Sequence, residues 1–240
     1  MRGVIKYVLN NVPRKHIQRV VHVVTPVMGL LYAGRREQCP VCGRRYRKFM
    51  PYGYGPTRDN ALCPSCLSLE RHRLMWLYLN NETDFFTANP RLLHIAPERC
   101  FMKRFGKVLG DNYITADLES PLAKVKMDVQ DIPFDDGEFD VIFCNHILEH
   151  VEDDRLAMRE MYRVMRAGGW GIMLSPVTPG KATTYEDPSI NTPEGRAAAF
   201  GQHDHMREYG EDYADRLAEA GFTVNAIDYA AQLPAEQLTL

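Results

Sequence analysis

The chain has no long apolar run. The charge-free stretch near its N-terminus, residues 20–34, is 15 residues long and contains His22 and Pro26. A helix that crosses a bilayer needs about 20 predominantly apolar residues, so this stretch is too short to span one. A secretory signal is lacking as well, because PRKH at residues 13–16 interrupts the early apolar run and no small-residue cleavage pattern follows. We therefore expect a cytoplasmic protein.

The chain also lacks internal repeats and low-complexity linkers. Its 240 residues exceed one average domain, and its 45% hydrophobic content is ordinary for a globular protein. We expect an α/β domain with an appendage: a basic, apolar helical segment over residues 1–34, a zinc ribbon over 35–70 and the main domain over 71–240.

Charge is distributed unevenly along the chain. Residues 1–75 hold 14 Lys and Arg against Glu37, Asp59 and Glu70, a net charge of about +11, which leaves 15 basic and 28 acidic residues, about −13, in the remainder. The basic part is expected to face nucleic acid, lipid headgroups or an acidic partner, or to dock on the acidic remainder of its own chain. For residues 1–34, two interpretations stay open: peripheral contact with an anionic membrane, or a helix packed on the main domain.

Four of the six cysteines form two Cys-x-x-Cys pairs. Twenty residues separate the pair Cys39 and Cys42 from the pair Cys63 and Cys66, a spacing typical of a tetrahedral four-thiolate zinc site. Redox pairs and disulfides are the alternatives, and the lack of an export signal argues against an oxidising compartment. Four thiolates leave no open coordination position, so the zinc is expected to be structural. Residues 43–60 are expected to connect the pairs as a basic hairpin.

Short apolar segments recur after residue 90 and alternate with helical or loop segments. The strands are expected over residues 91–96, 112–118, 124–129, 139–144, 170–177 and 222–229. This alternation predicts an α/β fold with a doubly wound parallel sheet, which binds ligands beyond the carboxyl ends of its strands.

Helices are expected over residues 68–81 and 152–166. The turn Ala167-Gly168-Gly169 is expected to end the second helix. One apolar face of that helix is predicted to hold Leu156, Met158, Met161, Val164 and Met165. At the other end of the chain, residues 230–240 offer no partner for the last strand, so an unpaired sheet edge and a dimer contact are expected.

Two motifs resemble those of a known family. DVQDIPFDDGEFDVIFCNHILEHV at residues 128–151 and REMYRVMRAGGWGIMLSPV at 159–177 are similar to the stretches around the fourth and fifth strands of class I S-adenosylmethionine-dependent methyltransferases of the type-11-like group. The resemblance covers about residues 90–230. It implies a Rossmann-like methyltransferase sheet and S-adenosylmethionine as the cofactor.

The resemblance also implies roles for residues at the strand ends. Asp117 would accept hydrogen bonds from the ribose hydroxyls, as a carboxylate does at this place in nucleotide-binding sheets. Asp128 would bind the adenine amino group beside the Val129 backbone. Asn145 would line the methionine end near the transferring methyl group.

The first motif departs from the family pattern. Family members carry an acidic residue and a GxGxG loop, in which glycine lets the backbone approach the cofactor closely, but this chain reads HIAPERC over residues 94–100. Cofactor binding by His94, Ala96 and Glu98 is therefore expected to use other contacts, such as a pairing of Glu98 with the methionine ammonium group. Loss of cofactor binding is the alternative.

The polar segment over residues 178–210 is expected to cover the acceptor side of the crevice. His205 is a candidate base for the acceptor proton. Arg207 is a candidate ligand for an acceptor carboxylate or phosphate, with Tyr209 beside it. The alternative is that these residues only cap the next helix.

The HILEH sequence at residues 146–150 offers a second set of candidates. His146 is expected to face the methyl group, whereas Glu149 and His150 are expected to begin the following helix.

Three functions stay open. The first is methylation of a small-molecule or glycan-like acceptor. The second is methylation of RNA, with Tyr46, Phe49, Tyr52 and Tyr54 of the basic ribbon stacking on unpaired bases. The third is a non-catalytic scaffold whose zinc ribbon binds a protein partner.

Overall fold

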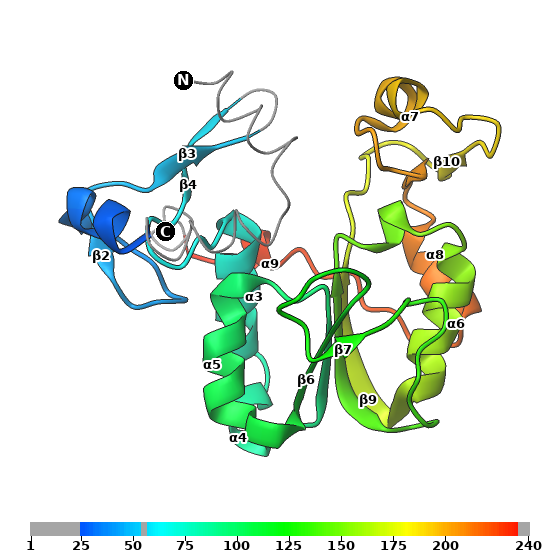
Figure 1. Ribbon diagram of the computed structural model, residues 1–240, viewed down its shortest axis with the longest axis horizontal. Helices are drawn as coiled ribbons and strands as arrows, with labels where there is room; N and C mark the ends of the chain where they lie inside the picture. Colours follow the sequence, from blue (N-terminus) through cyan, green and yellow to red (C-terminus); the bar gives the residue numbers. More distant parts are fainter. Residues whose placement is uncertain (1–24, 54–56, 235–240) are drawn as a thin grey trace. The chain divides into compact units, whose positions relative to one another are not determined.

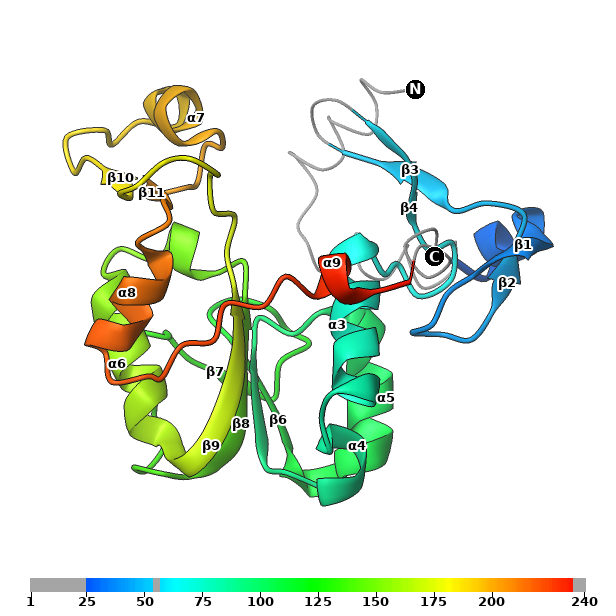
Figure 2. The ribbon, with the colours of Figure 1, turned by 180° about the vertical axis from the view of Figure 1, so that it is seen from behind.

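The computed structural model describes residues 25–53 and 57–234, which fold into two compact units (Figures 1 and 2). The first unit contains the described residues up to Asn89, together with Glu98–Val108 and the chain from Asp228 onward. The second contains Pro90–Pro97 and Leu109–Ile227. Most of the basic N-terminal segment and Tyr54 lie outside the described residues, so the expectations for them stay predictions.

The first unit begins with two small antiparallel sheets. β1 (Ala33–Gln38) pairs with β2 (Arg45–Tyr46), and β3 (Met50–Tyr52) pairs with β4 (Arg58–Leu62). The expected hairpin between the cysteine pairs is therefore limited to β3 and β4. Tyr46 and Phe49 are each only 1% exposed, which removes both rings from the surface on which bases were expected to stack.

Helices α3 (Glu70–Asn81), α4 (Phe85–Ala88), α5 (Arg99–Leu109) and α9 (Tyr229–Gln232) complete the first unit. An aromatic stack joins two of them, since the rings of Trp76, Phe101 and Phe105 lie nearly parallel with centroids 5.0–6.3 Å apart. The ribbon is attached to α3 by the buried Arg73, whose Nη1 donates hydrogen bonds to the carbonyl oxygens of Ala61 and Ser68.

The second unit is built on a parallel sheet, as the sequence predicts. Its strand order in the described chain is β7-β6-β5-β8-β9, and every pair is parallel. The strands are β5 (Leu92–Ile95), β6 (Tyr113–Asp117), β7 (Val125–Lys126), β8 (Phe139–Asn145) and β9 (Met165–Leu174). All residues of β5 are buried and so are all of β8 except Asp140, as expected for central strands with both faces covered.

Helices α6 (Asp154–Val164) and α8 (Tyr213–Glu219) lie side by side in the second unit (Figure 1). Met158, Met161 and Val164 of α6 are fully buried in the core of the sheet, as predicted. Leu156 is 36% exposed, so its placement on the apolar face was wrong. Ala157 takes its place because it shares the buried side of the helix with Met161 and Val164.

The glycine turn after α6 has a different role from the one predicted. α6 ends at Val164, before the glycines, and β9 already begins at Met165. A Cβ atom at Gly169 would lie 2.8 Å from the carbonyl oxygen of Asp140, and one at Gly171 would lie 2.8 Å from that of Ile142. Glycine is therefore needed here because β9 passes too close to β8 for a side chain.

The predicted sixth strand, residues 222–229, does not form. The described chain runs there without a ladder partner and turns into α9 at Tyr229. Phe222 packs against the core of the sheet, but Val224 and Ile227 are 36% and 40% exposed, so the rest of the apolar pattern that suggested a strand is not buried. Propensity for the extended state is not sufficient without a neighbouring strand. β9 is thus the last strand of the described sheet.

Part of the polar segment 178–210 has regular secondary structure. It contains the paired strands β10 (Tyr185–Glu186) and β11 (Arg207–Glu208) and the helix α7 (Pro193–Phe200). The short 3-10 turns η1 (Gly110–Asn112) and η2 (Leu148–His150) precede β6 and α6. None of the helices in the described ranges has the length and apolarity that a membrane span requires.

Candidate functional site

The carboxyl ends of β6, β5 and β8 lie beside one another at the same edge of the sheet. Ile95 of β5 pairs with Ala116 of β6 on one side and with Cys144 of β8 on the other. The residues that follow, Ala96, Asp117 and Asn145, therefore lie next to one another at the edge. The chain moves outward from β5 to β6 and β7 and then returns to β8, so the strand order reverses between β5 and β8. Open parallel sheets bind ligands at such a switch point.

Two non-glycine residues at this switch point have left-handed backbones. Ala96 has a φ of +45° and His146 has a φ of +55°. This conformation costs roughly 1–2 kcal/mol for a residue with a Cβ atom, and such strain concentrates at functional sites. The backbone after β5 thus adopts a conformation that glycine favours, although the chain has alanine there. The Ala96 amide donates to the carbonyl oxygen of Ala116, which secures the turn.

Asp117 lies at the end of β6 and is half-buried. Its Oδ1 accepts hydrogen bonds from the backbone amides of Glu119 and Ser120, at 2.8 and 2.7 Å. Its Oδ2 accepts no hydrogen bond from the described residues, so one carboxylate oxygen is available for a ligand. This geometry suits the predicted contact with ribose hydroxyls, which stays a prediction.

Asp128 and Val129 follow β7. The Asp128 carboxylate accepts hydrogen bonds from the backbone amide and the side-chain amide of Gln130, at 2.9 and 3.2 Å. Gln130 in turn accepts a hydrogen bond from the amide of Asp153, the residue that caps α6. Val129 is buried in the sheet core. The loop after β7 is therefore held by the residue that caps α6, a connection that the sequence did not indicate, and its contact with adenine stays a prediction.

His94 has a core position. It is fully buried in β5, where its Nδ1 lies 2.9 Å from the hydroxyl oxygen of Tyr113, and its ring packs edge-on against Phe143. These contacts make His94 part of the sheet interior, and a direct cofactor contact by this residue stays a prediction. Glu98 belongs to the first unit, directly before α5, and its pairing with the methionine moiety also stays a prediction.

Three polar groups meet beyond β8. His146 Nδ1 lies 3.3 Å from Glu149 Oε1, and the hydroxyl of Ser175 donates to Glu149 Oε2 at 2.9 Å. Burial by itself would raise the pKa of Glu149, but the hydrogen bonds from His146, the backbone and Ser175 outweigh it and hold that pKa below its ordinary value. The carboxylate is therefore charged at neutral pH and orients the His146 ring. Ser175 was not among the residues predicted for the site.

His150 and His205 come together although 55 positions separate them. Their rings pack edge to face with centroids 4.8 Å apart. His205 is 6% exposed, and desolvation together with the nearby charge of His150 lowers its pKa below the ordinary value, so it is neutral at pH 7. The prediction that Glu149 and His150 begin the following helix was wrong. They belong to the separate turn η2, because α6 is capped later, by Asp153.

Arg207 and Tyr209 belong to a buried polar network. Arg207 Nη1 and Nη2 donate to the carbonyl oxygens of Leu148, Val151 and Glu152, and its Nε donates to Glu186 at 3.0 Å. All its nitrogens are thus engaged within the protein, which leaves the predicted acceptor contact without support.

The same network contains Asp154, which is 3% exposed. Its Oδ2 accepts hydrogen bonds from the Tyr209 hydroxyl at 2.7 Å and from Arg216 Nη1 at 3.1 Å. Burial and the neighbouring Asp154 charge raise the pKa of Tyr209, so its hydroxyl stays protonated and donates. These contacts join the segment before α8 to the start of α6. The predicted role of Tyr209 on the acceptor side of the crevice receives no support from them.

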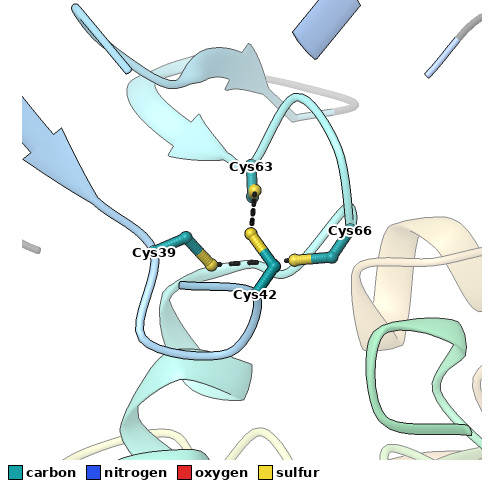
Figure 3. Close-up of side chains that lie close together, drawn as sticks. All are labelled: Cys39, Cys42, Cys63 and Cys66. Atoms are coloured by element: carbon teal, nitrogen blue, oxygen red, sulfur yellow. Dashed lines mark hydrogen bonds between the residues drawn. The ribbon is translucent and has the colours of Figure 1, made fainter. Parts of the chain in front are cut away.

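The four paired cysteines form a second, separate site in the first unit (Figure 3). Cys39 Sγ lies 3.6 Å from Cys66 Sγ, and Cys42 Sγ lies 3.7 Å from Cys63 Sγ. Disulfide sulfurs lie about 2.05 Å apart, whereas thiolates around a tetrahedral zinc ion lie roughly 3.8 Å apart, as Zn–S bonds of about 2.3 Å require. The spacing therefore fits a four-coordinate metal ion.

Both cysteine pairs have the same backbone geometry. The amides of Gly43 and Leu67 donate to the carbonyl oxygens of Cys39 and Cys63, at 2.7 and 3.0 Å. Gly43 and Leu67 both have positive φ angles, +70° and +61°. Each pair is thus closed by the same tight turn, although only the first has glycine at the left-handed position.

The thiols affect one another strongly. Hydrogen bonds with Cys42, Cys63 and Cys66 lower the pKa of Cys39. Hydrogen bonds with Cys39, Cys42 and Cys63 raise the pKa of Cys66. Four adjacent thiols cannot all ionise without a cation to compensate their charge. A divalent metal ion would resolve this conflict.

The parallel pairing and the reversal of strand order between β5 and β8 define a Rossmann-like α/β sheet. Residues 83–173 match the family model described as a methyltransferase domain. The sarcosine/dimethylglycine N-methyltransferase of Halorhodospira halochloris is 29% identical over 108 residues, which are 44% of this chain and 35% of that protein. The demethylmenaquinone methyltransferase of Staphylococcus carnosus is 37% identical over 60 residues, 25% of each chain.

The ajmaline N-methyltransferase of Rauvolfia serpentina is 40% identical over 60 residues, 25% of this chain and 21% of that protein. The chain thus spans about a fifth to a third of the length of these curated relatives. Among solved structures, the 1,6-didemethyltoxoflavin-N1-methyltransferase of Burkholderia thailandensis, with its substrate and S-adenosylhomocysteine bound, is similar with a TM-score of 0.44 and 16% identity, covering 66% of this chain and 69% of that one.

Proposed function

We propose that this protein transfers the methyl group of S-adenosylmethionine to a small-molecule or glycan-like acceptor. The observation that carries the proposal is the switch point between β5 and β8, where Ala96 and His146 have left-handed backbones beside Asp117 and Asn145. The family match over residues 83–173 supports the reaction class. The named relatives methylate small molecules such as sarcosine, demethylmenaquinone and ajmaline, which supports the acceptor class.

The strand-end residues fit the cofactor that this reaction needs. The open Oδ2 of Asp117 would bind the ribose hydroxyls, Asp128 and the Val129 backbone would bind adenine, and Asn145 would line the methionine end. S-adenosylmethionine supplies an electrophilic methyl group when it is bound. The left-handed turn at Ala96 would let the backbone approach it, which is the role that the family assigns to glycine.

His146 is the proposed base on the acceptor side. Its Nδ1 donates to the buried Glu149 carboxylate, so its Nε2 has the lone pair and can take a proton from an acceptor hydroxyl or amine. The His146 side chain is 33% exposed and can therefore be reached from solvent. Glu149 keeps the ring oriented and stabilises the imidazolium that forms.

The cofactor site is tested by titrating S-adenosylhomocysteine into the purified protein by calorimetry. We compare the unmodified protein with Asp117→Asn, because asparagine can still accept from the Glu119 and Ser120 amides while it loses the charge. We expect micromolar binding that weakens by about tenfold or more in the variant, since a hydrogen bond to a charged group contributes about 1.5–3 kcal/mol. The exposed Asp111→Asn is the control and should bind like the unmodified protein.

The absence of heat from the folded, unmodified protein would contradict the methyltransferase proposal. It would favour the non-catalytic scaffold instead. Equal binding by the unmodified protein and by Asp117→Asn would show that the protein binds the cofactor and that the charge of Asp117 does not contribute.

We also propose that Cys39, Cys42, Cys63 and Cys66 bind one structural zinc ion. The sulfur spacing and the two matching turns support this assignment. The four sulfurs would fill the coordination shell of the ion, so it would hold the ribbon together and take no part in catalysis.

A further inference from the structure

A second metal-ligand set lies beyond the carboxyl end of β8, in the second unit. Glu149, His150 and His205 each offer one ligand atom, and these three atoms lie within 4.8 Å of one another. Two of the residues come from η2, and His205 comes from the turn between α7 and β11. The set is therefore assembled by the fold.

Both histidine rings are oriented for metal binding. His205 Nδ1 lies 3.2 Å from the carbonyl oxygen of Phe200, and His150 Nδ1 lies 3.2 Å from that of Asp204. A carbonyl oxygen can only accept, so each Nδ1 has the proton and each Nε2 has the lone pair. Metal-binding histidines almost always donate their other ring nitrogen in this way, which fixes the tautomer and the ring plane.

Carboxylates complete the set. Asp204 Oδ2 lies 3.4 Å from His150 Nδ1, while its Oδ1 is buried without a hydrogen-bond partner among the described residues. Glu149 is 2% exposed, and its carboxylate accepts hydrogen bonds from His146, a backbone amide and Ser175, while two carboxylate oxygens offer about four lone-pair sites, so one remains for a cation. The two carboxylates, Glu149 and Asp204, bring negative charge to this pocket, which a divalent cation would neutralise.

We propose that Glu149, His150 and His205 bind a divalent transition-metal ion of the zinc class. Two imidazoles and one carboxylate are a ligand set for zinc and for iron, and three protein ligands leave a position open for an exogenous oxygen ligand. Ligand atoms around tetrahedral zinc lie roughly 3.4 Å apart, as bonds of about 2.1 Å require. The ligand atoms here lie within 4.8 Å of one another, so the His150 side chain, which is 33% exposed, would move inward when the ion binds. This site is distinct from the four-cysteine site, which has no open position.

The inference does not depend on the proposed methyl transfer, because metal uptake is measured without cofactor or acceptor. The protein is purified with zinc bound to the four cysteines of its ribbon, and elemental analysis verifies that it contains one equivalent of zinc. Zinc chloride is then titrated by calorimetry into the unmodified protein and into His150→Gln, His205→Gln and His203→Gln. His203 is the matched control, because its side chain is 74% exposed and lies in the same turn as His205.

We expect a second equivalent of zinc to bind the unmodified protein and the His203→Gln variant with the same affinity. The affinity should fall at least tenfold in His150→Gln and His205→Gln. His150→Gln keeps the test valid if the buried His205→Gln variant does not fold. Failure of the folded, unmodified protein to bind a second zinc at 100 μM, as an order of magnitude for a weak site, would overturn the proposal. Binding that depends on His203, or that survives in His150→Gln, would overturn it as well.

Discussion

The ribbon of the first unit and the sheet of the second unit are stabilised in different ways. The ribbon of the first unit has strands of 2–6 residues, and its largest buried rings are Tyr46 and Phe49. The sheet of the second unit encloses one apolar cluster that includes Leu93, Ile142 and Met161. A small module cannot bury enough apolar surface to offset the loss of chain entropy. The proposed zinc ion would therefore take the place of an apolar core in the ribbon.

Removal of zinc should have the largest effect, because we expect it to unfold the ribbon of the first unit and leave the sheet of the second unit folded. With a strong chelator, we expect the ribbon to unfold locally, because structural zinc contributes about 10–16 kcal/mol in isolated zinc-finger peptides. Hydrogen exchange should become fast at the amides of Cys39, Gly43, Cys63 and Leu67, which close the two turns. The amides of β8 should keep their protection.

Cys66→Ser should reproduce the effect of the chelator without any reagent. Cys100→Ala is its control, because Cys100 is buried but lies outside the cluster. Unchanged exchange in the ribbon after complete removal of the metal would show that zinc does not hold it.

The second prediction tests whether the sheet unit depends on apolar packing alone. Asp154→Ala leaves Arg216 and Tyr209 buried without their shared acceptor. Breaking a buried charge pair in this way costs about 3–5 kcal/mol. The free energy of unfolding, measured with urea, should fall by that amount. The exposed Asp215→Ala in α8 is the control and should change it by less than about 0.5 kcal/mol. A loss below about 1 kcal/mol in Asp154→Ala would mean that the network contributes little.

The third prediction concerns pH. Burial would raise the pKa of Glu186, but hydrogen bonds from Arg216 and Arg207 outweigh it and hold that pKa below its ordinary value of 4.5. A group with a lowered folded pKa stabilises the protein above its unfolded pKa, and this contribution is lost as pH falls through the folded pKa. The difference in urea midpoint between the unmodified protein and Glu186→Gln should therefore be constant above about pH 5 and shrink below 4.5.

The exposed Glu194→Gln in α7 serves as the control for that pH series. Its midpoint should follow the unmodified protein at every pH. A difference between Glu186→Gln and the unmodified protein that stays constant down to pH 3, below the ordinary range for a glutamate, would contradict the assignment of this ion pair.

The smallest expected effect is that of Ala96→Gly. Glycine removes the cost of a positive φ but loses more chain entropy on folding, so we expect a net gain of at most about 1 kcal/mol. Ala116→Gly, at an extended position in the neighbouring strand, should instead destabilise. Thermal unfolding of both variants measures the difference. Destabilisation by Ala96→Gly equal to that of Ala116→Gly would show that the turn at Ala96 is unstrained.

Most of the sheet could be predicted from the sequence. The runs over 91–96, 112–118 and 139–144 are short and largely apolar, and each matches an observed strand to within one residue at either end. The run over 222–229 has the same local character but forms no strand. Its outcome depends on whether a neighbouring strand offers hydrogen bonds, and local pattern does not contain that information.

The candidate site was predictable only in part. Asp117 and Asn145 could be placed at strand ends because parallel strands end at one edge. Arg207 and Tyr209 were taken for acceptor ligands from their residue types, but their contacts lie with Glu186 and Asp154. The meeting of His150 with His205 depends on the path of the segment between them, which polar residues alone do not specify.

The sequence by itself determined the local features of this protein: the spacing of the cysteines, the positions of the central strands and the amphipathic face of α6. Each depends on residues close together in the chain, whose chemistry and period can be read directly. Only the tertiary structure decided which distant groups share a buried environment, such as Asp154 with Arg216 or Glu149 with His205. The physical reason is that desolvation makes an unpaired buried polar group costly, so its role is set by the partners that the fold brings to it.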